Sequence, residues 1–428
     1  TYMCTASIGP GSLNMVTGAA LATTNRLPVL LFPSDQFATR VPDPVLQQLE
    51  DPTSLDVSVN DAFRPVSRFF DRINRPEQLI PSLLSAMRVL TDPAETGAVT
   101  IAMPQDVQAE VFDWPVELFR KRVWHVRRPV PEPAALERAV ALIKAAKRPL
   151  IIAGGGTIYA GASEELRALA TATGIPVGDT QAGKGAINFD HPSAVGGVGS
   201  TGCDSGNHIA DKADLIIGVG TRYSDFTTAS KTQFKNPDVK FVNINVTPFD
   251  AAKESAEMVV ADAREALSAL TEALADYHVE AAYSDEITQE KEAWLRATER
   301  CYHLDHGPLP AQTEVFGALN ELMGEEDVVI NAAGSMPGDL QALWQARSPL
   351  QYHVEYAFSC MGYEVPAAMG VKLARPEAEV VAIVGDGTYQ MLPMELATVV
   401  QENIKVIYVL LQNYGFCSFG ALSESRGS

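Results

Sequence analysis

One carboxylate and one amide follow two apolar runs near the end of the chain. Gly385-Asp386-Gly387 comes directly after Val380–Val384, and Asn413 comes shortly after Val406–Leu411. Both runs are short, β-branched and without alternation, which predicts strands buried on both faces. Asp386 and Asn413 offer hard oxygen ligands, and with the backbone carbonyl of Gly415 they can supply half of an octahedral Mg²⁺ shell. The set predicts a metal site whose remaining positions go to phosphate oxygens and water.

The element between the two runs decides whether these oxygens meet. Leu392, Leu396, Val399 and Val400 recur on one face of a helix that is predicted to begin near Pro393. Strand, helix and strand form a βαβ unit with parallel strands, so Asp386 and Asn413 are expected at the same carboxyl edge, where open α/β sheets bind ligands. For the glycine-rich tripeptide alone, an ordinary strand-to-helix turn is the alternative interpretation.

The spacing of 27 positions between Asp386 and Asn413, with an apolar strand on each side, resembles a known motif. It is similar to the Mg²⁺ and thiamine diphosphate motif of the acetolactate synthase and pyruvate decarboxylase superfamily, although Gln412 replaces the first of the two usual asparagines. The resemblance implies thiamine diphosphate and Mg²⁺ as cofactors. It assigns Asp386, Asn413 and Gly415 to the metal, and Gly385, Gly387 and Thr388 to the cofactor.

Two further stretches fit the same cofactor. The predicted strand Val328–Asn331 leads into Gly334, Ser335 and Met336, where small residues let a phosphate approach the backbone. Met361 precedes a predicted helix start, and a methionine there is on its own more often part of a core. The resemblance implies instead that Met361 wedges between the two rings of the cofactor and bends it.

Buried strands that alternate with helices predict an α/β fold with parallel sheets, and the resemblance implies three doubly wound parallel-sheet domains. The chain has 428 residues, of which 46% are hydrophobic, enough for two or three cores. The proline-rich stretch 127–133 is a predicted linker, and Glu286–Arg300 is a predicted connecting helix that is charged on most faces. The resemblance makes residues 1–125 the later part of a pyrimidine-binding domain, 131–277 a middle domain and 307–428 the earlier part of a diphosphate-binding domain. The first and last domains are therefore expected to be truncated.

A triple glycine at 154–156 follows a predicted strand of the middle domain. The dinucleotide pattern G-x-G-x-x-G fails, because Tyr159 stands at the third glycine position. A bound nucleotide is the less favoured interpretation, and a domain that only braces its neighbours is the alternative. Further along, Ser163 is predicted to cap a helix that ends at Gly174.

Charge and cysteine content exclude several classes of partner. The balance of 33 basic against 53 acidic residues gives a net charge of -20, which argues against nucleic acid and anionic membrane surfaces. No apolar stretch approaches a membrane span and no signal-peptide pattern opens the chain, so we predict a cytoplasmic protein. An odd number of scattered cysteines predicts reduced thiols without a zinc site; they are Cys4, Cys203, Cys301, Cys360 and Cys417.

Three longer runs resemble one branch of the superfamily, the ring-opening hydrolases of myo-inositol catabolism. They are 40–48 (RVPDPVLQQ), 181–185 (QAGKG) and 221–230 (TRYSDFTTAS). The resemblance implies hydrolytic C–C cleavage of a small cyclic diketone, a trihydroxycyclohexane-1,2-dione, to 5-deoxy-glucuronate by a homodimer or homotetramer. The alternatives are a pyruvate-using carboligase or decarboxylase like acetolactate synthase, and an inactive cofactor-binding fragment. The glutamate that activates the cofactor is expected upstream of Thr1, so no catalytic residue is assigned.

Overall fold

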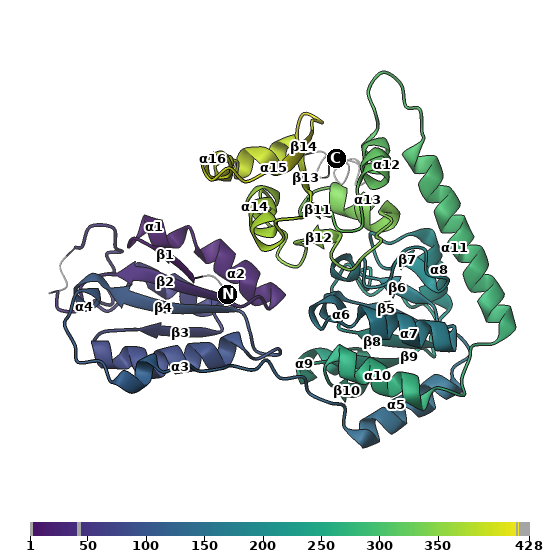
Figure 1. The fold of residues 1–428 in the computed structure, drawn as a ribbon, viewed down its shortest axis with the longest axis horizontal. Helices are drawn as coiled ribbons and strands as arrows, with labels where there is room; N and C mark the ends of the chain where they lie inside the picture. Colours follow the sequence, from purple (N-terminus) through teal and green to yellow (C-terminus); the bar gives the residue numbers. More distant parts are fainter. Residues whose placement is uncertain (1–2, 41–43, 417, 419–428) are drawn as a thin grey trace. The chain divides into compact units, whose positions relative to one another are not determined.

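The computed structural model describes residues 3–40, 44–416 and 418, and it contains three parallel sheets flanked by helices (Figure 1). The chain divides into two compact units, residues 1–128 and 129–428, and each is described by itself. The predicted α/β class is confirmed. Residues 41–43 of the first family-specific run, and Cys417, lie outside the described residues.

The first unit holds one four-stranded parallel sheet in the order β1-β2-β4-β3. Leu31 of β2 packs against Ala19 and Ala22 of α2 on one face, and Ile101 of β4 packs in a cluster with Val89 of α3 on the other. Its elements are β1 Met3–Ala6, α1 Pro10–Leu13, α2 Val16–Asn25, β2 Val29–Asp35, η1 Val59–Val66, β3 Phe69–Arg72, η2 Pro76–Gln78, α3 Leu79–Leu90, β4 Ala98–Pro104, α4 Gln105–Gln108 and η3 Val116–Phe119.

The second unit begins with a six-stranded parallel sheet in the order β10-β9-β8-β5-β6-β7. The order reverses between β5 and β8, which is the arrangement of a doubly wound dinucleotide fold. Its elements are α5 Pro133–Ala145, β5 Pro149–Ala153, α6 Gly155–Tyr159, α7 Ser163–Thr173, β6 Val177–Asp179, η4 Gln181–Gly183, β7 Ala194–Gly197, α8 Asp204–Lys212, β8 Leu215–Val219, β9 Lys240–Asn245, α9 Pro248–Ala251, η5 Lys253–Ser255, β10 Glu257–Val260 and α10 Ala263–Ala273.

Of the two predicted ends of α7, the N-terminal cap at Ser163 is wrong and the C-terminal end at Gly174 is confirmed. Ser163 is the first residue of the helix, its N-cap is Ala162, and the buried Ser163 hydroxyl bonds no residue that the structure describes. The helix ends where Gly174 adopts φ 69°, a left-handed conformation that a glycine accepts without steric cost.

The connecting helix α11, Ala281–Tyr302, is longer than the predicted Glu286–Arg300, and one of its sides is buried. Tyr283, Ile287, Trp294 and Tyr302 are buried on one side of it. Trp294 Nε1 donates to the carbonyl of Ala342 at 2.7 Å, and the Tyr302 hydroxyl donates to the carbonyl of Leu343 at 2.7 Å. The helix therefore braces the third sheet as well as covering the second.

The third sheet has the order β12-β11-β13-β14, and every pair in it is parallel. One apolar cluster lies on each face: one includes Trp344 and Phe316, and the other includes Ala368 of α14. Its elements are α12 Gln312–Leu322, β11 Val328–Asn331, α13 Met336–Leu343, β12 Tyr352–Val354, α14 Glu364–Ala374, β13 Val380–Gly385, α15 Asp386–Met391, α16 Glu395–Gln401 and β14 Ile407–Leu411.

The two predicted strands that flank the glycine motif both form, but only β13 is buried on both faces. In β14, Ile407 and Leu410 are 42% and 47% exposed, so the prediction of two-sided burial is wrong there. The reason is position, since β14 is the edge strand of the described sheet and pairs only with β13. The helix expected near Pro393 is α16, but a separate helix, α15, already begins at Asp386.

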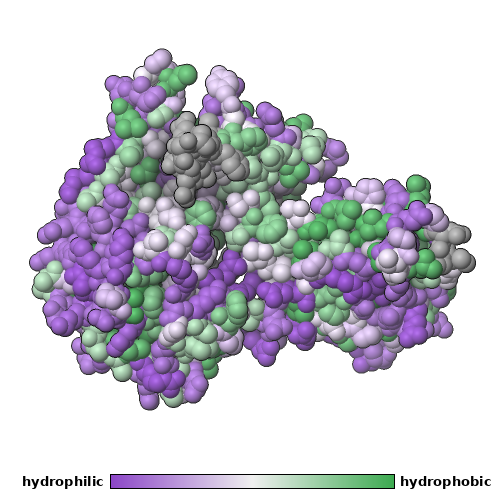
Figure 2. Space-filling view, turned by 180° about the vertical axis from the view of Figure 1, so that it is seen from behind, coloured by the Kyte–Doolittle hydropathy of each residue, from purple (hydrophilic) through white to green (hydrophobic). Residues whose placement is uncertain are grey.

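The surface mixes hydrophobic and hydrophilic residues, as the face in Figure 2 shows. Among the described residues, no helix combines the length and the hydropathy that a membrane crossing requires. The described cysteines, which are Cys4, Cys203, Cys301 and Cys360, are free thiols.

Candidate cofactor site

The register of the third sheet brings Asp386 and Asn413 together. Gly385 at the end of β13 pairs with Leu411 at the end of β14, so the next residues of both strands leave the sheet at one edge. The Asp386 carboxylate joins the two loops, because its Oδ2 accepts from the Tyr414 amide at 2.8 Å and its Oδ1 from the Gly387 amide at 2.9 Å. The predicted convergence of these two side chains is therefore what the structure shows.

The side-chain amide of Asn413 reaches both other members of the predicted metal set. One of its two terminal atoms lies 2.8 Å from the carbonyl oxygen of Gly415 and 3.1 Å from Asp386 Oδ1. If that atom is Nδ2, it donates to both oxygens. With the amide turned the other way, its Oδ1 lies at these two distances from the carbonyl and carboxylate oxygens, which is the separation of neighbouring ligands in an octahedral Mg²⁺ shell, about 3 Å for bonds of about 2.1 Å. The donor set thus fits a hard divalent cation.

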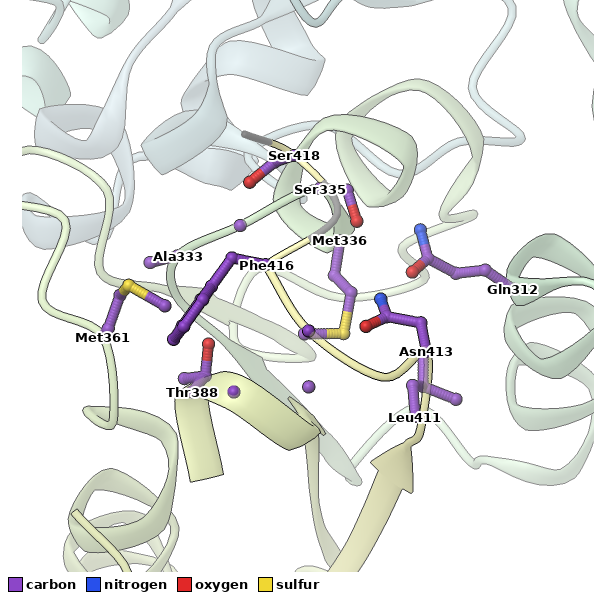
Figure 3. A pocket seen from close by; sticks show the side chains of 14 residues that line it. Gln312, Ala333, Ser335, Met336, Met361, Thr388, Leu411, Asn413, Phe416 and Ser418 are labelled. Carbon is purple, nitrogen blue, oxygen red and sulfur yellow. The ribbon is translucent and has the colours of Figure 1, made fainter. Parts of the chain in front are cut away.

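A pocket with an empty volume of about 370 Å³, which includes space open to solvent, lies beside this edge (Figure 3). In the figure Met361 and Asn413 stand on opposite sides of it, with the ring of Phe416 between them. The pocket is lined by all seven residues that the sequence assigned to the cofactor: Gly334, Ser335, Met336, Met361, Gly385, Gly387 and Thr388. Two of the three expected metal ligands, Asn413 and Gly415, also line it, whereas Asp386 does not.

Glycines keep the pocket open where a phosphate has to approach. A Cβ added at Gly334 or Gly415 would meet no atom within 4 Å, and at Gly385 the nearest atom is Met336 Cε at 3.7 Å. Gly387 differs, because a Cβ there would lie 2.7 Å from the ring of Phe416. This cradle of missing side chains fits a diphosphate, as the cation site beside it does.

Sequence reasoning missed five residues that line the pocket: Gln312, Ala333, Leu411, Phe416 and Ser418. Ala333 and Leu411 adjoin predicted positions, and Phe416 follows Gly415, so extending each motif by one or two residues would have found them. Gln312 gives no such signal. It opens α12 far from either motif, and its Nε2 donates to Asp339 Oδ2 at 2.6 Å.

Two titratable groups lie beside Met361. Glu364 is fully buried, and neither of its carboxylate oxygens has a hydrogen-bond partner among the described residues. Burial raises the pKa of Glu364 to about 7. Burial, reinforced by the nearby carboxylate of Glu355, raises the pKa of the Cys360 thiol to about 12. At neutral pH Glu364 is therefore able to exchange a proton, whereas Cys360 stays a neutral thiol and is a poor nucleophile.

The glycine-rich loop of the middle sheet is packed quite differently. The Gly156 amide donates to the carbonyl of Gly220 at 3.0 Å, and a Cβ at Gly154 would lie 2.4 Å from the same carbonyl oxygen. Two loops thus meet backbone to backbone at the point where the strand order reverses. The triple glycine has a structural reason in this contact, which supports the interpretation as a bracing domain.

Comparison with models of protein families shows to which class of enzyme the chain belongs. Residues 136–270 match the model described as "Thiamine pyrophosphate enzyme, central domain", and residues 332–428 match "Thiamine pyrophosphate enzyme, C-terminal TPP binding domain". The second match begins directly after β11 and contains the Asp386–Asn413 pair and the loops around it. A chain with both domains is a thiamine pyrophosphate-dependent enzyme.

Comparison with individual proteins shows to which family of thiamine pyrophosphate enzymes this chain belongs. The chain is 50% identical to 3D-(3,5/4)-trihydroxycyclohexane-1,2-dione hydrolases of Bacillus cereus (strain AH820) and Bacillus thuringiensis (strain Al Hakam), and 49% identical to that of Bacillus anthracis (strain CDC 684 / NRRL 3495). Each alignment covers 99% of this chain and 70% of the relative. The chain belongs to this family of hydrolases, which confirms the resemblance inferred from the sequence.

Proposed function

We propose that this protein hydrolyses a carbon–carbon bond of 3D-(3,5/4)-trihydroxycyclohexane-1,2-dione and releases 5-deoxy-glucuronate, as a step of myo-inositol breakdown. The observation that carries the proposal is the 50% identity, along 99% of the chain, to hydrolases named for this substrate. The reaction consumes one water, which ends in the new carboxylate. The enzyme is proposed to act in the cytoplasm as a homodimer or homotetramer.

The pocket of the third sheet is the proposed cofactor site. Its support is the open space at Gly334, Gly385 and Gly415, together with the donor set of Asp386, Asn413 and the Gly415 carbonyl. Mg²⁺ bound there would offset the negative charge of the diphosphate. The protein as a whole cannot do so, because its net charge of -20 repels anions. Thr388 and Ser335 line the same pocket, and their hydroxyl groups would be available to hydrogen-bond the diphosphate.

When bound, thiamine pyrophosphate supplies the carbon nucleophile and the electron sink for cleavage between two carbonyls. The chain's contribution is to hold and orient. Met361 lines the pocket and would give the bound cofactor an apolar support, and the neutral Cys360 thiol beside it offers no competing nucleophile.

The test is a comparison of substrates with purified protein, thiamine pyrophosphate and Mg²⁺. We expect ring opening of the trihydroxycyclohexanedione, followed as appearance of the open-chain acid, and little acetolactate from pyruvate. Rapid acetolactate formation without ring opening would move the assignment to the pyruvate-using enzymes. Omitting either thiamine pyrophosphate or Mg²⁺ after dialysis should abolish the activity.

A further inference from the structure

The loop between β12 and α14 carries Met361 to the pocket, and it contains a strained residue. Ser359 has φ 59°, in the left-handed region. For a residue with a Cβ this conformation is unfavourable, and it persists only where the surroundings enforce it. Ser359 lies two positions before Met361, so whatever holds Ser359 in place also sets where Met361 stands.

The group that holds it is the carboxylate of Glu355. Glu355 Oε1 accepts from the Phe358 amide at 2.9 Å, and Oε2 accepts from the Cys360 amide at 2.8 Å. The two donors are the residues on either side of Ser359, so both oxygens of one carboxylate are used to close the turn around it. Glu355 is only 3% exposed, and amide hydrogen bonds to a buried charged acceptor are among the stronger ones in proteins.

The rest of the loop is held at both ends. Glu355 directly follows β12, and its own amide donates to the carbonyl of Asn331 in β11 at 3.4 Å. Beyond Met361, the Tyr363 hydroxyl bonds His353 Nε2 at 2.8 Å. The loop is therefore anchored to the sheet on each side, and the carboxylate fixes the part that no strand or helix holds.

We propose that Glu355 is a positioning residue of the cofactor pocket: its carboxylate clamps the turn 358–360, so that Met361 stands at the pocket wall before thiamine pyrophosphate binds. This inference rests on the proposed function in one respect, which is that the ligand of the pocket is thiamine pyrophosphate. It assigns no catalytic role to Glu355, because both carboxylate oxygens are engaged by backbone amides.

The test uses Glu355→Gln, which keeps the shape but replaces one acceptor by an NH₂ group that faces an amide donor. In the cofactor-free protein, hydrogen exchange of the Phe358 and Cys360 amides should accelerate about tenfold or more. Affinity for thiamine pyrophosphate with Mg²⁺, measured by calorimetry, should fall about tenfold. Glu377→Gln, an exposed glutamate of the same domain, is the matched control and should change neither quantity.

A second substitution separates positioning from direct contact. Ser359→Gly removes the cost of φ 59°, so the double variant Glu355→Gln/Ser359→Gly should recover most of the cofactor affinity. If Glu355→Gln alone fails to fold, the double variant is measured in its place and is still expected to bind. If Glu355 touched the cofactor directly, a change of backbone freedom at Ser359, four residues further along the chain, would not restore binding. Absence of rescue would therefore overturn the clamp.

The outcomes also separate this inference from the proposed function. A wild-type protein that binds no thiamine pyrophosphate contradicts the proposed function. A wild-type protein that binds it, with exchange at Cys360 or the affinity unchanged in Glu355→Gln, contradicts the clamp alone.

Discussion

The second unit contains two parallel sheets whose carboxyl edges both carry glycine-rich loops, and the two edges are built for different purposes. At the middle sheet, Gly154 and Gly156 lie against the backbone of Gly220, with no room for a Cβ. At the third sheet, Gly385 and Gly334 face open space. The same residue type thus serves close packing at one edge and leaves a cradle at the other.

The difference shows that a glycine motif after a strand does not by itself indicate a phosphate site. What distinguishes the two edges is the chemistry around the glycines. Asp386, Asn413 and the Gly415 carbonyl converge beside the open cradle. At the closed edge the Gly156 amide and the Gly220 carbonyl already bond to one another, and Thr157 Oγ1 donates to the Val219 carbonyl at 3.0 Å.

The largest expected effect is a loss of cofactor affinity when a proposed metal ligand at the open edge is removed. Asp386→Ala removes one of three proposed Mg²⁺ ligands and also the acceptor of the Tyr414 amide. Affinity for thiamine pyrophosphate in the presence of Mg²⁺ should fall about a hundredfold or more, measured by titration calorimetry. The control is Asp225→Ala, an exposed aspartate at the closed edge, which should keep its affinity. Unchanged affinity in Asp386→Ala would remove this residue from the metal site.

A pair of glycine substitutions tests the contrast directly. In Gly154→Ala the new Cβ would lie 2.4 Å from the Gly220 carbonyl oxygen, so backbone has to move. We expect a loss of about 3 kcal/mol in the free energy of unfolding. In Gly385→Ala the Cβ meets nothing closer than 3.7 Å. Stability should change by less than about 1 kcal/mol, while cofactor affinity falls because the methyl group occupies the cradle.

Denaturant unfolding and calorimetry on both variants give the measurement. The reverse pattern, a stable Gly154→Ala and an unfolded Gly385→Ala, would show that the two edges had been assigned the wrong way round.

The part of this contrast that could be predicted from sequence is the open edge. Short β-branched runs and the 27-residue spacing are local signals, and they correctly predicted β13, β14 and the meeting of Asp386 with Asn413. The closed edge could not be predicted, because the contact of Gly154 with Gly220 joins loops 66 positions apart in the chain. No local pattern reports which loops will touch.

Two other features were missed for different reasons. The apolar stripe of α11, with Ile287, Trp294 and Tyr302, is visible in the sequence at helical spacing but is diluted by its many charged neighbours. The clamp around Ser359 was invisible, because a left-handed serine and the carboxylate that holds it follow from a loop conformation and have no periodicity. Buried strands and regular helices are thus easier to predict than the loops that finish the site.

A smaller effect concerns pH and Glu364, beside the open edge. Its folded-state pKa is raised to about 7 from an ordinary value of 4.5, so between these values the folded protein keeps a proton that the unfolded chain has lost. Stability should therefore fall as pH rises from about 4.5 to 7, by about 2 to 3 kcal/mol in total.

Glu364→Gln cannot ionise, and it should be more stable than the wild type at pH 8 and similar to it near pH 4.5. Urea unfolding across this range measures the difference. An identical pH slope in the variant would assign the titration to another group.

The smallest expected effect lies where the loops of the two edges touch. Phe226, in the family-specific run 221–230 of the middle sheet, meets Tyr356 of the clamped loop edge-to-face, with ring centroids 4.9 Å apart and an interplanar angle of 87°. Phe226 is 41% exposed, so the contact is worth only about 0.5–1 kcal/mol. A double-mutant cycle of Phe226→Leu and Tyr356→Leu should return a coupling of that size in the free energy of unfolding. If the closed edge does no more than brace the open one, both single variants should weaken cofactor binding less than threefold. A loss as large as that of Asp386→Ala would instead show that the middle-sheet loop takes a direct part in the cofactor site.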